Sequence, residues 1–314
     1  MATLVASGPF LALLLACAFF ASQSDRFLTG PNFSLILQQV IVVGVIAIGQ
    51  TLIVLTAGID LSCGMVMALG SILMSKAAVD YGLSAGNAVA CGILATMAFG
   101  FLNGALITFV RLPPFIVTLG TLNIAFAITQ IYSASQTVSG LPDAMIVLGD
   151  TFNLGGTTIT YGTVLMLVLY ILVWFVLRET AAGRHVYAAG NNPEAARLMG
   201  IPIGGLILGV YTLAGLTYGI AAMLAVARTG VGDPQAGQTE NLDSITAVVL
   251  GGTSLFGGRG GILGSLVGAL IVGVFRNGLT LMGVASVYQI LITGILVILA
   301  VATDRLSRRK GLQS

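Results

Sequence analysis

Long apolar runs, separated by a few polar or glycine positions, recur along nearly the whole chain. A helix needs roughly 20 apolar residues to cross the hydrocarbon core of a bilayer, which is about 30 Å thick. The polar interruptions divide the chain into ten predicted helical spans, at residues 4–22, 35–56, 62–79, 85–110, 114–134, 161–178, 204–227, 242–256, 261–283 and 286–303. The pattern therefore predicts an all-α integral membrane protein in which residues 1–314 form one transmembrane domain.

The third and eighth predicted spans, 62–79 and 242–256, are short and contain glycine. Loose backbone at membrane depth is tolerated only where protein or a watery cavity surrounds it, so these spans are expected to be broken or re-entrant helices. The pattern GxLxGALI occurs at residues 100–107 and 264–271, in spans predicted to run in opposite directions. It suits five spans followed by five inverted ones, although such glycines also serve ordinary close packing of membrane helices.

Basic residues indicate the orientation, because Lys and Arg concentrate in cytoplasmic loops. With both termini in the cytoplasm, three of the 13 basic residues (Arg26, Lys76 and Arg228) lie outside, and Arg276 lies within the ninth span. The other nine lie inside: Arg111, Arg178, Arg184, Arg197, Arg259, Arg305, Arg308, Arg309 and Lys310. The first 22 residues contain no Lys or Arg, so we expect a retained first span rather than a secretory signal peptide.

Composition agrees with a membrane protein and excludes several classes of function. Hydrophobic residues make up 57% of the chain and charged residues 8%, whereas about a quarter of a soluble domain is charged. The net charge of +2 does not indicate nucleic-acid binding, because the basic residues lie in membrane-flanking loops. Three cysteines without metal-ligand spacing, Cys17, Cys63 and Cys91, are expected to act as small apolar residues, so no metal or cofactor is predicted.

Residues 179–203 form a polar interlude in this apolar chain and are expected to be a cytoplasmic loop. Asn192 suits a helix N-cap and Pro193 the first helical position, so a short helix is predicted from there until Gly200 ends it. A short exposed helix between two spans is well placed to be held by something outside the membrane.

Enzyme signatures are absent from the sequence. The glycine-rich stretch at residues 251–261 does not match a phosphate-binding loop and is interpreted as a tight cytoplasmic connection. His185, the only histidine, has no partner at a ligand spacing, so a solvated loop position is favoured. If transport by this chain is driven by ATP, another chain must supply the ATPase.

Polar residues inside predicted spans are costly in lipid and often line a transport path. Most of them are neutral amides, which suit a passing polyol better than an ion, although each alone is also explained by an interhelical hydrogen bond. The candidates are Gln38, Gln39, Gln50, Thr51, Asn103, Asn123, Gln130, Asn277 and Gln289.

Charged residues in and between the spans allow two interpretations each. Asp60 is either a proton-carrying carboxylate or, as we favour, a turn residue that accepts from the amides beginning the third span. Arg276 is expected to have a structural partner or to snorkel. Asp233, Glu240 and Asp243, in an outside segment without basic residues, form either a docking surface for an extracytoplasmic partner or a merely solvated loop.

Several stretches resemble the membrane subunit of ribose-type sugar ABC importers, whose permeases carry monosaccharides such as ribose, xylose or galactose. These stretches are PNFSLILQQ (31–39), QTLIVLTAGIDLSCG (50–64), AAGRHVYAAGNNPEAARLMGI (181–201) and residues 242–284, followed by SVYQI (286–290). Together they extend over nearly the whole chain. The departure from the family is the short, uncharged N-terminus.

The resemblance implies a multi-pass protein of the bacterial inner membrane, surrounded by lipid and working as a homodimer. It also implies a separate cytoplasmic ATPase and a periplasmic sugar-binding protein. The loop bearing Asn192, Pro193, Glu194, Ala195, Ala196, Arg197 and Gly200 is then the family's EAA-type coupling loop, which docks in the ATPase. The alternative is an ion-coupled secondary transporter of a small polar solute that uses Asp60.

Overall fold

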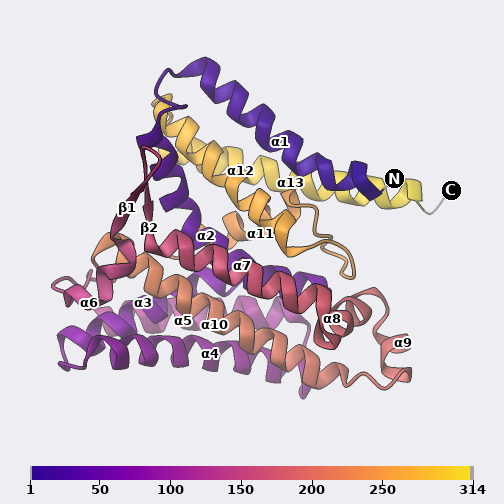
Figure 1. The fold of residues 1–314 in the computed structure, drawn as a ribbon. Coiled ribbons are helices and arrows are strands. Elements are labelled where there is room, and N and C mark those ends of the chain that lie inside the picture. The colour runs from indigo at the N-terminus through magenta and orange to yellow at the C-terminus, as the bar shows by residue number, and fades with distance from the viewer. Residues whose placement is uncertain (1, 312–314) are drawn as a thin grey trace.

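The computed structural model describes residues 2–311 as helices, two short strands and connecting loops (Figure 1). The elements are α1 (Ala2–Gln23), α2 (Gly30–Leu55), α3 (Cys63–Val79), α4 (Ala85–Thr108), α5 (Pro114–Ser133), α6 (Asp143–Ile146), the 3-10 turn η1 (Val147–Gly149), β1 (Thr151–Leu154), β2 (Thr157–Thr160), α7 (Tyr161–Glu179), α8 (Ala181–Asn191), α9 (Pro193–Leu198), α10 (Ile203–Thr229), α11 (Glu240–Leu250), α12 (Ile262–Leu281) and α13 (Ser286–Gly311).

The predicted helical membrane architecture is confirmed. Six helices are long and apolar enough to cross a bilayer, namely α2, α4, α5, α7, α10 and α12. Shorter apolar helical stretches lie at Gly8–Gln23, Cys63–Val79 and Ser286–Leu299. Every predicted span overlaps one of the helices, because continuous apolar sequence satisfies its backbone hydrogen bonds internally as a helix.

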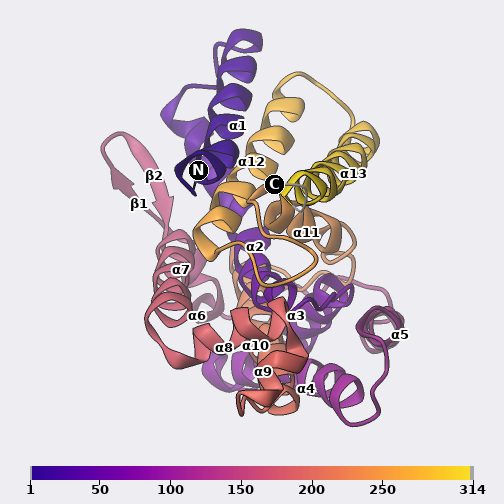
Figure 2. The ribbon, with the colours of Figure 1, turned by 90° about the vertical axis from the view of Figure 1, so that its right-hand side faces the viewer.

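Helices α2 and α10 form the centre of the molecule. Every residue of α2 from 40 to 55 is buried, and the helix packs against α7, α10, α11 and α12. Helix α10 packs in turn against α2, α3 and α4. Viewed from the side of α8 and α9, α5 lies at one edge of the bundle and the β1–β2 hairpin at the opposite edge (Figure 2).

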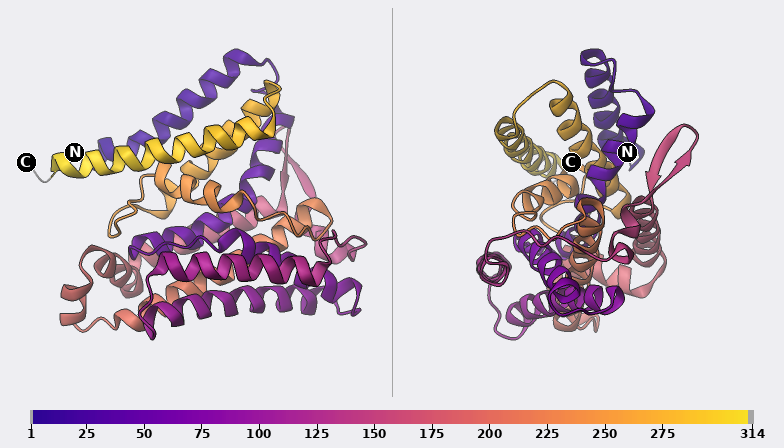
Figure 3. Two further views of the ribbon diagram at one scale, coloured as in Figure 1. Left: turned by 180° about the vertical axis from the view of Figure 1, so that it is seen from behind. Right: turned by 90° about the vertical axis from the view of Figure 1, so that its left-hand side faces the viewer.

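The two ends of the molecule differ in character. Helices α8 and α9 lie at the same end as the two chain termini, whereas α6 and the β1–β2 hairpin lie at the opposite end (Figures 1 and 3). The hairpin was not predicted. Its strands pair antiparallel from Thr151 opposite Thr160 to Leu154 opposite Thr157, and Ser34 Oγ hydrogen-bonds Thr158 to fix the hairpin on α2.

Helix α11 ends at Leu250, six residues before the predicted end of the eighth span. A β-carbon on Gly251 would stand 2.3 Å from the carbonyl oxygen of Gly264, and Gly252 has a φ of +84°, so glycine permits a sharp turn here. Residues 251–261 thus form the expected tight connection. The 11 residues of α11 rise about 16 Å, roughly half of a bilayer core.

The GxLxGALI pattern marks close packing in both places where it occurs. Gly100 and Gly104, late in α4, pack on the backbone of α10, whereas Gly264 and Gly268, at the beginning of α12, pack on the end of α11. In a five-plus-five repeat the two copies would lie at the same position in their helices and contact equivalent helices. Here one copy lies late in α4 and contacts α10, whereas the other lies early in α12 and contacts α11. The pattern is explained by glycine at close helix contacts and not by a repeated half.

Candidate functional site

Helix α9 has the bounds and caps that the sequence predicts. The side-chain Oδ1 of Asn192 accepts a hydrogen bond from the backbone amide of Ala195 at 3.0 Å, and Pro193 begins the helix. Gly200 follows with a φ of +86°, a left-handed conformation that glycine adopts without strain. Ala196 is buried, whereas Glu194 in the first turn and Arg197 in the last turn are exposed. One face of α9 therefore holds to the protein and the other is free.

The end of α9 presents two large apolar side chains that the sequence interpretation missed. Leu198 is 86% exposed and Met199 is 72% exposed, at the end of α9, which lies at the same end of the molecule as α8 (Figure 1). Apolar side chains this exposed at a polar tip indicate a contact surface. The available signal was the pair of large apolar residues at the end of the predicted helix, just before Gly200, in an otherwise polar loop.

Helix α8 joins this tip to the interior and was not predicted as a separate helix. A β-carbon on Gly190 would stand 1.8 Å from the carbonyl oxygen of Leu55, the last residue of α2. The same oxygen accepts a hydrogen bond from the amide of Gly258 at 2.9 Å. Tyr187 Oη donates to the carbonyl of Gly260 at 3.1 Å, and partial burial raises the pKa of Tyr187, which keeps its hydroxyl protonated. Helix α8, the end of α2 and the glycine-rich loop are thus packed backbone to backbone.

The break between α2 and α3 contains Asp60, which is only 1% exposed. Its Oδ1 accepts from the amide of Ser62 at 2.7 Å and from the Ser62 hydroxyl at 2.6 Å. Its Oδ2 accepts from Tyr218 Oη at 3.0 Å. These contacts agree with the favoured interpretation of Asp60 as the turn residue that begins the third span.

Side chains from four helices converge on this break. Gln50 Nε2 of α2 donates to the Asp60 carbonyl at 2.6 Å, and Asn103 Nδ2 of α4 donates to Ser62 Oγ at 3.1 Å. The carbonyl oxygen of Ile59 accepts from Thr118 of α5 at 3.3 Å and from Tyr211 of α10 at 3.2 Å. Sequence reasoning missed the two tyrosines, because a tyrosine in an apolar helix carries no signal of its partner.

The nine candidate pathway residues do not form one site. Only Gln50 and Asn103 come together, at the Asp60 break. Thr51 joins α2 to Ser265 at 2.8 Å, Asn277 joins α12 to Asn32 at 2.9 Å, and Gln289 donates to Thr280 at 3.2 Å. Gln38 and Gln39 are half-buried along α2, whereas Asn123 and Gln130 lie two turns apart along α5 and are exposed and half-buried, respectively.

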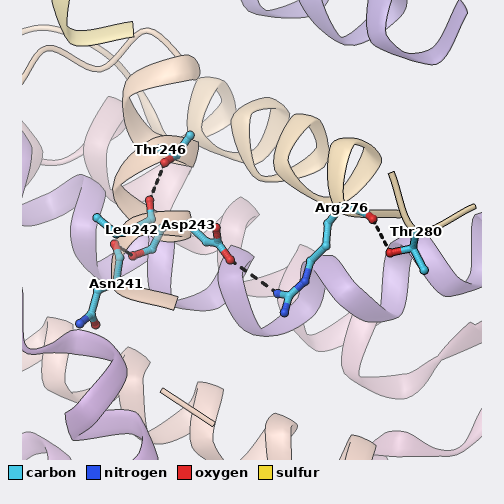
Figure 4. Close-up of polar contacts among 7 residues, drawn as sticks. Asn241, Leu242, Asp243, Thr246, Arg276 and Thr280 are labelled. Carbon is cyan, nitrogen blue, oxygen red and sulfur yellow. Dashed lines mark hydrogen bonds and ion pairs between the residues drawn. The ribbon is translucent and has the colours of Figure 1, made fainter. Parts of the chain in front are cut away.

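The three outside acids do not share one exposed surface, which corrects the expectation for Asp243. Asp243 is 6% exposed, and its Oδ2 lies 3.5 Å from Arg276 Nη1 (Figure 4). Asp243 is therefore the structural partner that Arg276 was expected to have. A buried, ion-paired carboxylate cannot contact a docking protein. Asp233 and Glu240 are half-buried and line a cavity of about 140 Å³ together with Arg228.

Comparisons with known proteins place the chain among permeases. The family described as branched-chain amino acid transport system / permease component matches residues 32–301. The fructose import permease of Rhizobium meliloti is 44% identical over 97% of this chain and 86% of its own length. The ribose import permease of Bacillus subtilis is 38% identical over 95% of this chain and 92% of its own length. The D-allose transport system permease of Escherichia coli is 36% identical over 95% of this chain and 91% of its own length. The chain therefore belongs to this permease family, as the multi-pass membrane component of an ABC importer whose ATPase activity resides on a separate subunit.

Proposed function

We propose that this chain is the transmembrane pathway of an ABC importer for a monosaccharide. The observation that carries the proposal is the similarity, over nearly the full chain, to permeases named for fructose, ribose and allose. The polar groups inside the helical bundle are mostly amides and hydroxyls, which can exchange hydrogen bonds with a neutral polyol.

The proposed topology has ten spans with both termini and α8–α9 in the cytoplasm. It is supported by α1 beginning and α13 ending at the same end of the molecule as α8 and α9 (Figures 1 and 3). The predicted excess of Lys and Arg at that end supports the same orientation. Helices α3 and α11 complete the ten as short spans, whose loose ends are enclosed by neighbouring helices.

An inverted repeat of five helices plus five is supported by the packing rather than by the GxLxGALI pattern. If α1–α5 correspond to α7 and α10–α13, the contact of α4 with α10 corresponds to the contact of α12 with α2. The contacts of α3 with α4 and α5 likewise correspond to those of α11 with α12 and α13. The two short helices, α3 and α11, are then equivalent, as expected of broken helices in the two halves of a transporter.

Residues 179–203 are proposed to be the coupling segment that the ATPase grips. The residues proposed to touch the ATPase, or to shape the helix that does, are Asn192, Pro193, Glu194, Ala195, Ala196, Arg197 and Gly200. The exposed side chains of Leu198 and Met199 are added to this set. A capped, rigid helix with an apolar tip can fill a groove in a partner and follow its movement as a rigid body.

Movement of α9 would reach the centre of the bundle through α8. Gly190 contacts Leu55 at the end of α2, and Gly257 packs against Ala57, three residues before Asp60. Backbone contacts of this kind transmit displacement directly, because no flexible side chain lies between them. The Asp60 break is thus the first part of the membrane region that nucleotide-driven movement of α9 would displace.

The passage is proposed to lie between two copies of the chain, along α5. Half of the residues of α5 are exposed, including Asn123. Seven residues separate Asn123 from Gln130, so both side chains lie on one face of the helix. An exposed amide is costly against lipid and favourable against a watery passage or a second copy. These two residues are the pathway candidates that the arrangement of helices favours.

A periplasmic sugar-binding protein is proposed to dock at the end opposite α9. Asp233 supports this role, because it is partly exposed in the loop before α11 and its Oδ1 is held by the amide of Gln235 at 2.8 Å. Glu240, in the first turn of α11, lines the same cavity beside Arg228 as Asp233 does. Asp243 is excluded by its pairing with Arg276.

Reconstitution tests the proposed function against the ion-coupled alternative, which the family assignment disfavours. The chain is placed in proteoliposomes with its cognate ATPase and binding protein, and uptake of radiolabelled pentoses and hexoses is measured. We expect uptake only with ATP inside the vesicles and with all three components present. Uptake driven by an ion gradient without ATP, and abolished in Asp60→Asn, would overturn the proposal.

A further inference from the structure

The first turns of α3 and α11 meet inside the bundle through one amide side chain. Asn241 of α11 accepts, at Oδ1, a hydrogen bond from the backbone amide of Gly64 at 2.5 Å. The thiol of Cys63 donates to the same oxygen at 3.3 Å. Ser62, the N-cap residue of α3, gives no side-chain cap of its own. Helix α3 is therefore capped by a residue of another helix, 177 positions away in the chain.

Glycine makes this contact possible on both sides. A β-carbon on Gly64 would stand 2.2 Å from the carbonyl oxygen of Gly237 and 2.5 Å from Asn241 Oδ1. A β-carbon on Gly237 would stand 2.0 Å from the carbonyl oxygen of Gly64. The loop leading into α11 thus touches the beginning of α3 backbone to backbone, and any movement of α3 relative to α11 must separate these atoms first.

The contact between the beginnings of α3 and α11 brings two helix N-termini together, and nearby acidic side chains offset the repulsion between them. Helix N-termini carry partial positive charge, so two of them side by side repel each other. Asp60 beside the beginning of α3, and Glu240 and Asp243 in the first turn of α11, offset this repulsion. Asp243 is in turn held by Arg276 of α12 (Figure 4). The contact is balanced between attraction and repulsion, as a switching element requires.

The beginning of α3 is also the place that the coupling segment reaches. Ser62 binds Asp60 and accepts from Asn103, and the other end of the same break is packed against α8 through Leu55. The break is therefore held from the end of α8 and α9 by backbone contacts and from the opposite side by Asn241. A pull transmitted through α8 acts against the hydrogen bond between Asn241 and Gly64.

We propose that Asn241 is a positioning residue of the transport cycle. It holds the beginning of α3 against α11 in the arrangement described here. Its hydrogen bond to Gly64 breaks and re-forms each time the permease switches between its two openings. The inference rests on the proposed function as an ATP-coupled permease. The switching contact is thereby assigned to the side chain of Asn241 and the backbone N–H of Gly64, away from the surface proposed to touch the ATPase.

A cross-link tests whether the contact must open. In a Cys17→Ala, Cys91→Ala background, Asn241→Cys places a second thiol beside the native Cys63. Mild oxidation should form a disulfide, detected by mass spectrometry of the peptides. ATP-driven sugar uptake should then fall at least tenfold below that of the same variant in its reduced form and return to that level on reduction. The matched control keeps Asn241 and is oxidised in the same way. Uptake that survives complete cross-linking, or failure of the two thiols to join, would overturn the inference.

Replacements of Asn241 separate positioning from simple stability. Asn241→Asp keeps an acceptor oxygen near the Gly64 amide and should retain uptake within about twofold. Asn241→Ala removes the acceptor and should lower uptake at least fivefold while more ATP is hydrolysed per sugar imported, a change of ratio that the modest loss of stability from removing a helix cap does not by itself produce. Equal loss of uptake and of melting temperature in both variants would indicate a merely structural role. Failure of the proposed function would instead appear as absent ATP-driven uptake by the unmodified protein.

Discussion

Gly190 of α8 lies directly against the carbonyl oxygen of Leu55, the last residue of α2, with no space for a side chain between them. Two elements that are 135 positions apart in the chain are thereby joined at the boundary between the coupling segment and the membrane region. The contact depends on the absence of a β-carbon at position 190. A single methyl group placed there should separate the two elements.

Gly190→Ala is therefore expected to weaken coupling and stability together. The new β-carbon would stand 1.8 Å from a backbone oxygen, which cannot move as a flexible side chain does. Overpacking of this kind costs about 1–3 kcal/mol. We expect a lower melting temperature in detergent and less sugar imported per ATP hydrolysed. Gly205→Ala in α10 is the matched control, since its β-carbon would meet open space, and it should leave both measurements unchanged or slightly improved.

Leu198→Ala and Met199→Ala should weaken binding of the ATPase without affecting the fold. Both side chains are largely exposed in the isolated chain, so their removal leaves no cavity. Burying a leucine in an interface contributes about 1.5–3 kcal/mol, which corresponds to a loss of roughly tenfold to a hundredfold in affinity. Titration of the purified ATPase measures the change. Leu154→Ala, at an exposed leucine of the opposite end, should bind like the unmodified protein, and an equal loss there would contradict the assignment.

Glu194→Lys and Gly200→Asp should leave the protein inserted but uncouple uptake from ATP hydrolysis. Glu194 lies in the first turn of α9, where the helix dipole favours a negative charge. Gly200 follows the last turn with a φ of +86°, so an aspartate there would add a side chain in the left-handed region and a negative charge that the dipole disfavours. The ratio of sugar imported to ATP hydrolysed is the measurement. Glu194→Gln and Gly200→Asn are milder partners, because neither introduces a charge that the helix dipole disfavours, and they should retain more coupling. Unaltered uptake in the severe pair would remove the coupling assignment.

Much of the fold could be predicted because membrane helices are encoded locally. Continuous apolar sequence between polar interruptions located each helix of the bundle, and the Asn192 and Gly200 signals located α9 to within a residue. The end of α11 was predicted too late, because the apolar side chains continue past Leu250 while the backbone turns at Gly251. There the close approach of Gly264, a tertiary contact, decides the geometry.

The candidate site was only partly predictable for the same reason. Asp60 could be assigned to a turn, because its nearest partner Ser62 is two residues away in the chain. Its other partner, Tyr218, and the pairing of Asn241 with Gly64 join positions more than 150 residues apart. No local pattern distinguishes such a residue from an ordinary polar position in a helix.

Asp233→Asn tests the docking surface after Asp243 has been removed from it. We expect weaker stimulation of ATP hydrolysis by the binding protein, because Asp233 is the outside acid that is partly exposed in the loop before α11. The effect should be confined to the response to the binding protein, with basal hydrolysis unchanged. Asp25→Asn, another exposed acid in a loop that was not assigned to docking, serves as the control. An unchanged response in Asp233→Asn would make that loop a solvated surface without a partner.

Asp243→Asn should act on stability instead, because the carboxylate is buried against Arg276 of α12. The pair joins α11 to α12 with one member nearly enclosed and the other about half exposed, so its loss is expected to cost on the order of 1–2 kcal/mol, between the values for exposed and buried pairs. Thermal unfolding of Asp243→Asn, Arg276→Gln and the double variant measures the coupling. If the pair stabilises the fold, the double variant should lose less than the sum of the two single losses. Strictly additive losses would mean that the two charges do not interact in the membrane, and the contact between α11 and α12 would then rest on its glycines alone.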